Sequence, residues 1–186
     1  MEDAAIVELY FARAERAIQE TINKYGTYCM TVSRNILHNE EDAEECVSDT
    51  WVKAWNAIPP ERPRALKCYL AKITRNLSIN RYHQKTAARR GGTETEIVLD
   101  ELEEVIAGTQ SVEDAVTAKE LGALIDAFVR ALPAREGNVF IRRYFFTEGV
   151  DAIAKRYGLS ANNVSVMLNR TRKKLKDHLL EAGYAV

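Results

Sequence analysis

The chain has 186 residues, a formal net charge of -1 and an apolar fraction of 46%, which allows packed cores and argues against wholesale disorder. No stretch is long and apolar enough to suggest a membrane span, and the acidic N-terminus lacks a signal-peptide pattern. We therefore expect a cytoplasmic protein without a membrane partner.

The charges are strongly segregated along the chain. Residues 39–49 hold six acids and no base, and residues 62–93 hold nine bases and no acid. Residues 94–104 again hold six acids and no base, and residues 152–176 hold seven bases and no acid. Two basic zones in a chain of almost no net charge indicate two separate surfaces that face polyanions.

Helical periodicity dominates, and the first strongly patterned helix is acidic. Over residues 41–58 the outward stripe consists of Glu41, Glu45, Ser48, Asp49 and Val52. From this segment alone, an acidic stripe is more often ordinary solvated charge, and core packing is expected for Trp51 and Trp55.

The next helix, over residues 66–86, is basic. Its predicted buried face is Leu66, Leu70, Ile73 and Leu77. The remaining positions interleave bases, amides and aromatics, a mixture that suits phosphate binding and contacts with exposed bases: Lys72, Arg75, Asn76, Asn80, Arg81, Tyr82, His83 and Lys85. RNA binding would give a similar pattern, and His83 is expected to be simply a polar side chain on the surface of this helix.

Residues 87–111 change sharply in charge, contain three glycines and read as a flexible linker, with a short helix expected near residues 98–106. We therefore predict an all-α protein of two small helical domains, residues 1–86 and 112–186, joined by this linker.

The C-terminal domain is predicted to contain a helix-turn-helix. Helices are expected over residues 113–132, 134–146 and 150–157, followed by a turn at Gly158 and a helix capped by Ser160. The last helix carries amides first and bases afterwards, which fits contact with base edges in the major groove followed by contacts with phosphates. The competing interpretation is an amphipathic surface helix whose bases suit the helix dipole.

The sequence indicates no catalytic or metal site. Cys29, Cys46 and Cys68 are widely spaced, so buried reduced thiols are expected and no zinc site or disulfide framework. We find no nucleophile-base set, paired-carboxylate cleft or phosphate-binding glycine loop, so neither enzymatic activity nor a cofactor is predicted.

The order of these motifs resembles the extracytoplasmic-function (ECF) group of bacterial sigma-70 family factors. The similarity is carried by DAEECVSDTWVKAW, LAKITRNLSINRY, the acidic linker and LPAREGNVFIRRYFFTEGVDAIAKRYGLS with the helix after it. It implies a sigma factor that binds the beta-prime clamp and beta flap of core RNA polymerase, recognises promoter DNA and starts transcription. The resemblance also implies a monomer when free; anti-sigma factors are common in the family, but no residue identifies one.

The resemblance implies two sets of site residues, and the outward pattern of the last helix supplies a third. The clamp-binding set is Glu45, Ser48, Asp49, Trp51 and Trp55. The set for the minus-ten promoter element is Lys72, Arg75, Asn76, Asn80, Arg81 and Tyr82. The set for the minus-thirty-five element is Ser160, Asn162, Asn163, Ser165, Val166, Asn169, Arg170, Arg172 and Lys173. The linker would run towards the RNA exit channel.

Two positions depart from the family pattern. Ser48 stands where the family usually has Gln, and Val164 is followed by Ser-Val-Met-Leu instead of Lys-Ser-Arg-Leu. The minus-thirty-five contacts therefore cannot simply be copied. A stand-alone helix-turn-helix regulator that binds an operator is the alternative, although it leaves the acidic and basic helices of the first domain without a shared purpose.

Overall fold

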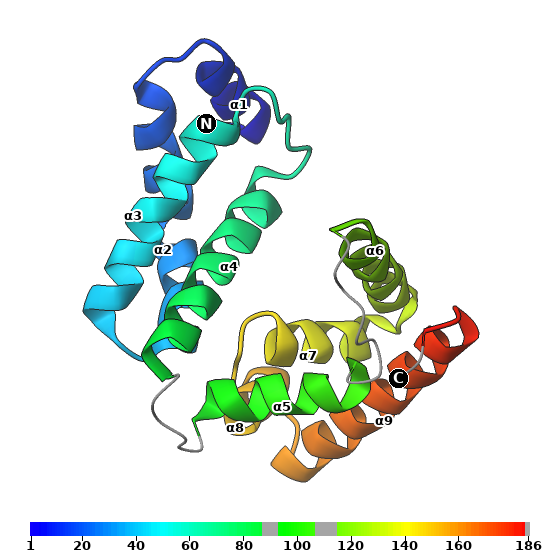
Figure 1. The fold of residues 1–186 in the computed structure, drawn as a ribbon. Coiled ribbons are helices and arrows are strands. Elements are labelled where there is room, and N and C mark those ends of the chain that lie inside the picture. The colour runs from blue at the N-terminus through cyan, green and yellow to red at the C-terminus, as the bar shows by residue number, and fades with distance from the viewer. Residues whose placement is uncertain (87–92, 107–114, 185–186) are drawn as a thin grey trace. The chain divides into compact units, whose positions relative to one another are not determined.

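The computed structural model describes residues 1–86, 93–106 and 115–184, and within these ranges every regular element is an α-helix. The chain divides into two compact units, residues 1–90 and 91–186 (Figure 1). Each unit has its own hydrophobic core. The predicted fold class, an all-α chain of two helical domains, is confirmed. No helix among the described residues is long and apolar enough to cross a membrane.

Over residues 1–86, the first unit is built from three long helices and one short one. They are α1 (Asp3–Phe11), α2 (Arg16–Leu37), α3 (Glu40–Ala57) and α4 (Leu66–Thr86). The helices α2, α3 and α4 pack against one another, and α1 packs on α2 (Figure 1). The side chain of Asn39 caps α3 by accepting a hydrogen bond of 2.9 Å from the backbone N–H of Asp42. The helix ends at Ala57, and the next residue, Ile58, has the extended backbone that a following proline favours.

The buried face of α4 differs from the predicted one. Leu66 and Leu70 are fully buried as expected, but Ile73 and Leu77 are only partly buried, and Thr74 and Ser78 take the interior positions. Their hydroxyls stay satisfied because each bonds to the carbonyl oxygen four residues earlier, at 2.9 Å and 2.8 Å.

These hydroxyls also meet hydroxyls on the neighbouring helices. Thr74 Oγ1 lies 3.1 Å from Thr50 Oγ1 of α3, and Ser78 Oγ lies 2.8 Å from Ser33 Oγ of α2. Such contacts require close approach of the helices, so small polar residues line the interior where α4 meets its two partners.

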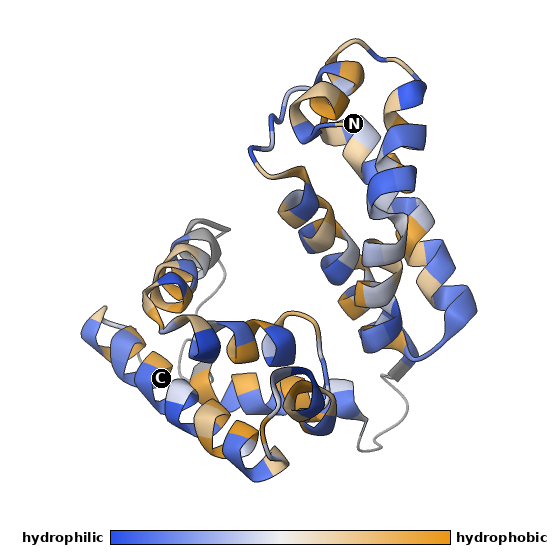
Figure 2. Ribbon diagram, turned by 180° about the vertical axis from the view of Figure 1, so that it is seen from behind, coloured by the Kyte–Doolittle hydropathy of each residue, from blue (hydrophilic) through white to orange (hydrophobic). Residues whose placement is uncertain are grey.

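In the described residues of the second unit, five helices surround a separate core. They are α5 (Glu94–Ile106), α6 (Ala115–Ala131), α7 (Ala134–Tyr144), α8 (Val150–Tyr157) and α9 (Ala161–Glu181). Figure 2 shows that apolar and polar residues alternate along these helices, as packing of amphipathic helices on a shared core requires. Helix α9 contacts all four others, and its buried stripe is Val164, Leu168, Thr171, Leu175 and Leu179.

The predicted turn between α8 and α9 is confirmed. Gly158 has φ 63° and ψ 37°, the left-handed conformation that glycine adopts without steric cost. The backbone N–H of Leu159 then bonds to the carbonyl of Ala154 at 2.9 Å, and the Ser160 hydroxyl accepts from the N–H of Asn163 at 3.2 Å. The helix-turn-helix of the second unit is therefore α8 followed by α9.

The segment expected to be linker is partly a packed helix. Residues 94–106 form α5, and Val98 and Val105 are buried in the core of the second unit. The remaining linker residues, 87–92 and 107–111, lie outside the described residues. Among described residues, the boundary between the units therefore falls before α5 and not after it.

Candidate nucleic-acid interface

The five predicted clamp-binding residues do not share one surface. Glu45, Ser48 and Asp49 are exposed on α3, where Val52 adds an apolar side chain that is 56% exposed. In contrast, Trp51 is only 9% exposed and belongs to the core of the first unit. Its position therefore supports the packing of α3 and leaves the exposed face to its neighbours.

Trp55 is half-buried in the last turn of α3. Its ring lies 6.0 Å from that of Tyr10, and the guanidinium of Arg13 sits 5.3 Å from the ring centroid. Arg13 also donates a 2.6 Å hydrogen bond to the carbonyl of Trp55. The N-terminal segment thus covers part of this tryptophan.

Two ion pairs join the acidic helix α3 to the basic helix α4. Arg81 pairs with Glu45, and Lys85 reaches Asp42 with nitrogen-oxygen distances of 2.6 Å and 2.5 Å. Both contacts are partly exposed, so each contributes little to stability. They nevertheless show that Glu45 and Arg81, which were predicted for two different partners, lie together.

The predicted minus-ten residues vary in exposure. Lys72, Asn76 and Asn80 are exposed on α4, whereas Arg75 is half-buried and Tyr82 is only 6% exposed. Burial lowers the pKa of the Arg75 guanidinium. Tyr82 is therefore placed to pack inside the unit and not to stack on a base.

An open groove of about 620 Å³ lies between α3 and α4, beside the exposed part of the predicted set. Its lining is Lys53, Asn56, Ala57, Glu61, Tyr69, Lys72, Ile73 and Asn76. Burial, together with a hydrogen bond to Glu61, raises the pKa of Tyr69 to about 12, so the phenol stays neutral at physiological pH. The groove combines two lysines, two amides and an aromatic ring, a set that suits a base and its phosphate.

Sequence reasoning assigned only two of these lining residues, Lys72 and Asn76, to a binding site. Lys53 and Asn56 are three residues apart on the outward side of α3, and Tyr69 precedes Lys72 by the same spacing on α4. This helical spacing was available as a signal. The sequence does not show that the two stripes face one groove, to which Glu61 also contributes.

The predicted minus-thirty-five residues lie mainly on the outward face of α9. Exposed there are Asn162, Asn163, Ser165, Val166, Asn169, Arg170 and Lys173, with Ser160 exposed at the cap. Asn163, Val166 and Arg170 also border a depression of about 330 Å³ beside Arg135, Glu136, Leu159 and Met167. An amide-rich first half and a basic second half on one free face match the requirements for base and phosphate contacts.

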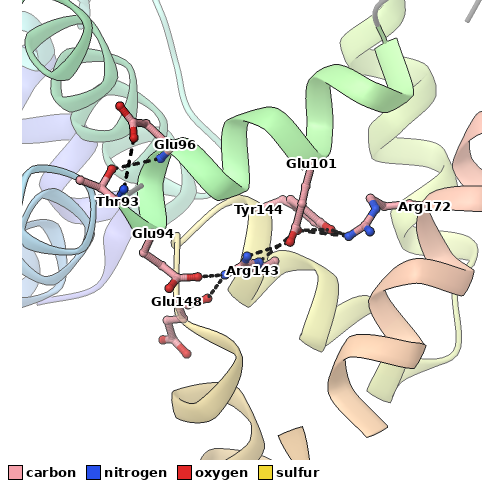
Figure 3. Close-up of polar contacts among 8 residues, drawn as sticks. All are labelled: Thr93, Glu94, Glu96, Glu101, Arg143, Tyr144, Glu148 and Arg172. Carbon is pink, nitrogen blue, oxygen red and sulfur yellow. Dashed lines mark hydrogen bonds and ion pairs between the residues drawn. The ribbon is translucent and has the colours of Figure 1, made fainter. Parts of the chain in front are cut away.

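Arg172 is the exception within this set. Its side chain is only 17% exposed and points towards α5 and α7, as Figure 3 shows. Its Nη1 donates to the hydroxyl of Tyr144 at 2.7 Å and lies 3.1 Å from Glu101 Oε2. In this structure Arg172 therefore belongs to an internal network and not to the free face.

At the centre of that network lies Arg143, which is 2% exposed (Figure 3). Its Nε and Nη2 donate to the two carboxylate oxygens of Glu101 at 3.2 Å and 2.9 Å, the two-pronged geometry that a guanidinium favours. Its Nη1 pairs with Glu94 and lies 3.3 Å from the carbonyl of Glu148. A buried arginine is thus fully paired, which burial of a charge requires.

The pKa values reflect the balance between burial and pairing. Burial alone would lower the pKa of Arg143, but the hydrogen bonds to Glu101 and Glu94 raise it. Burial alone would raise the pKa of Glu101, yet hydrogen bonds from Arg143 and Tyr144 hold it below its usual value. Both groups are therefore charged near neutral pH.

The cysteines match the prediction only in part. Cys29 and Cys46 are buried, and burial raises the pKa of both thiols, whereas Cys68 is exposed. Cys68 lies one turn before the exposed Lys72 on α4, outside the buried stripe. No cluster of three or more metal-binding side chains occurs in the described part of the chain.

Both units have counterparts among known proteins. A model of sigma-70 region 2 matches residues 11–88, and a model of sigma-70 region 4 matches residues 123–175. The ECF RNA polymerase sigma factor SigE of Mycolicibacterium smegmatis is 21% identical over 160 residues, which cover 86% of this chain and 60% of SigE. The RNA polymerase sigma factor SigF of Mycobacterium tuberculosis is 30% identical over 100 residues, which cover 53% of this chain and 36% of SigF.

Proposed function

The chain belongs to the extracytoplasmic-function group of the sigma-70 family, and we propose that it binds core RNA polymerase and directs promoter recognition, DNA melting and transcription initiation. The observation that carries this proposal is the pairing, in one chain, of a region 2 unit with an exposed basic and amide-bearing helix and a region 4 unit with a helix-turn-helix. A stand-alone regulator would need only the second unit.

The second unit is proposed to read the minus-thirty-five element through α9. The exposed amides of Asn162, Asn163 and Asn169 suit adenine edges, and the exposed methyl groups of Val166 suit a thymine methyl group. Arg170 and Lys173 follow on the same free face and would bind phosphates, which adds affinity without sequence information.

The first unit is proposed to capture the minus-ten element as single-stranded DNA. Lys72 and Asn76 open onto the groove between α3 and α4, where Tyr69 supplies an aromatic surface. Contacts with an unstacked base there would offset the cost of unpairing and unstacking, which is a few kcal/mol for each extruded base. No covalent step is needed, because binding energy alone drives the opening.

The exposed face of α3 is proposed to dock on the beta-prime clamp. Ser48, Asp49 and Val52 form a small mixed surface with one acid and one apolar side chain. An acid at the edge of an apolar contact can select a basic partner surface and fix its register. The second unit would contact the beta flap in the same assembly.

A run-off transcription assay tests the proposal. Core polymerase, the protein and a library of genomic promoter fragments should give transcripts of discrete length that core polymerase alone does not give. Absence of such transcripts from every fragment would contradict the sigma function. Tight and specific operator binding by the protein without polymerase would instead support a stand-alone regulator.

A further inference from the structure

Helix α5 lies, in the sequence, between the two segments that match the sigma-70 models, yet it packs as part of the second unit. The matches end at residue 88 and resume at residue 123, whereas α5 spans Glu94–Ile106. It packs on α7 and α9 through the buried side chains of Val98 and Val105. The acidic segment that resembles a linker is therefore part of the structure around the recognition helix.

One carboxylate of α5 joins three side chains from two other helices. Glu101 accepts from Arg143 through both oxygens, and its Oε2 also accepts from the Tyr144 hydroxyl at 2.9 Å, both residues being on α7. The same oxygen lies 3.1 Å from Nη1 of Arg172 on α9 (Figure 3). Removing this carboxylate would leave the buried Arg143 and the hydroxyl of Tyr144 without their shared acceptor.

The contact to Arg172 fixes the rotation of α9 about its own axis. Apolar stripes are tolerant of small rotations, whereas a charge-assisted hydrogen bond is directional and short. Arg172 lies at the edge of the buried stripe, three residues after Asn169 of the exposed face. A helix that turned about its axis would move Asn162, Val166 and Asn169 away from the base edges that they are proposed to read.

We propose that Glu101 is a positioning residue for promoter reading, which acts by holding α7 and the recognition helix α9 in register through Arg143, Tyr144 and Arg172. This inference rests on the proposed function of α9. It assigns the acidic segment to the specificity of the second unit, and it makes Arg172 an anchor of the helix instead of a phosphate contact.

The direction in which DNA affinity changes when Glu101 is removed separates a positioning role from simple repulsion of phosphates by an acid. If Glu101 were only an acid near DNA, its loss would strengthen binding to every sequence, because repulsion of phosphates would fall. If it positions α9, its loss weakens binding to the correct minus-thirty-five element while binding to other sequences stays equal or tightens. The ratio of the two affinities is therefore the readout.

The experiment uses the reconstituted holoenzyme and two promoter fragments that differ only in an intact or a scrambled minus-thirty-five element. The affinity ratio is the affinity for the intact fragment divided by that for the scrambled one. We expect this ratio to be about tenfold lower for the Glu101→Gln holoenzyme than for the wild type, as loss of a charge-assisted hydrogen bond predicts. The matched control is Glu104→Gln, which removes the same charge from an exposed position of the same helix and should keep the ratio.

A second variant covers the case in which Glu101→Gln does not fold. Arg172→Lys keeps the positive charge and leaves the buried Arg143 untouched, but it loses the planar group that bridges Tyr144 and Glu101. A phosphate contact would tolerate this change with the ratio intact, whereas an anchor would not.

The outcomes are distinct for the inference and for the proposed function. A wild-type ratio of about one would overturn the reading of DNA by α9, and this inference with it. If the wild-type ratio is well above one and a folded Glu101→Gln protein keeps it, the positioning role alone is overturned. If Glu101→Gln does not fold, the same ratio kept by Arg172→Lys overturns that role.

Discussion

At the scale of single residues, the exposed face of α9 is proposed to make two kinds of contact with DNA. Asn162 and Lys173 are both exposed on this face, in its amide-rich and its basic half. An amide that reads an adenine edge contributes discrimination, whereas an ammonium that binds phosphate contributes affinity for any sequence. The two substitutions to alanine should therefore differ in kind and not only in size.

We expect Asn162→Ala to relax base preference at one position of the minus-thirty-five element, at a cost of about 1–3 kcal/mol for the preferred base. Lys173→Ala should weaken binding to all fragments about equally and lower the slope of affinity against salt by about one ion. Holoenzyme binding to fragments with single base changes, measured over a salt series, checks both. A uniform loss with Asn162→Ala would contradict its assignment to base reading.

The residues that sequence reasoning placed on the surface were correct where an outward stripe was clear. Ser48, Asp49, Asn76 and Asn162 are exposed as the helical pattern predicts. Arg172 is different, because it lies in a basic run with Arg170, Lys173 and Lys174, and only a distant acid explains its inward position. Glu101 lies far from it along the chain, and one sequence without an alignment gives no signal that pairs the two.

At the scale of elements, prediction worked for the turn and cap of the helix-turn-helix and failed for the buried face of α4. Gly158 and Ser160 mark the turn and cap of the helix-turn-helix because their local chemistry is sufficient. On α4, however, two stripes compete: one contains Ile73 and Leu77, the other Thr74 and Ser78. Apolarity favours the first stripe, but the close approach of α2 and α3 selects the second, which is tertiary information.

The docking of α5 should depend on pH through Glu101. Its pKa is lowered in the folded chain relative to the ordinary value of 4.5, so the folded state favours the charged form. The stability from this group is therefore present above pH 4.5 and is lost as pH falls through the lowered pKa. Acid should weaken the second unit before the carboxylate is fully protonated.

Thermal unfolding between pH 7 and pH 3 checks this expectation. Wild-type protein should lose stability in the acid range, while Glu101→Gln should start about 2 kcal/mol lower at neutral pH and show a flatter acid dependence. Glu104→Gln, which changes an exposed acid of the same helix, should follow the wild-type curve. Identical acid slopes for wild type and Glu101→Gln would show that this carboxylate does not titrate with unfolding.

At the scale of the whole molecule, the organisation differs from two domains separated by a long linker. The described helices α4 and α5 are separated by residues 87–93, because α5 belongs to the second unit. The sequence predicted a short helix near residues 98–106 within the linker, but it did not indicate that this helix packs on the second unit. Two acids of α5 are bonded to Arg143, which no local pattern indicates.

The assembly with polymerase is proposed to depend on the exposed face of α3, and there Asp49 is the sharpest test. Within the described part of the chain Asp49 is exposed and makes no ion pair, whereas the neighbouring Glu45 is bonded to Arg81. A change at Asp49 therefore disturbs no internal contact, while a change at Glu45 would.

We expect Asp49→Arg to weaken association with core polymerase at least tenfold, because a basic clamp surface would then face a like charge instead of an acid. Helical content should stay unchanged, since the side chain is exposed. Glu15→Arg is the matched control: it makes the same change in charge at another exposed position of the first unit. Affinity measured by fluorescence anisotropy should fall only for Asp49→Arg, and the loss should shrink at high salt as screening removes the repulsion. Equal affinities for the two variants would place the clamp contact elsewhere on the first unit.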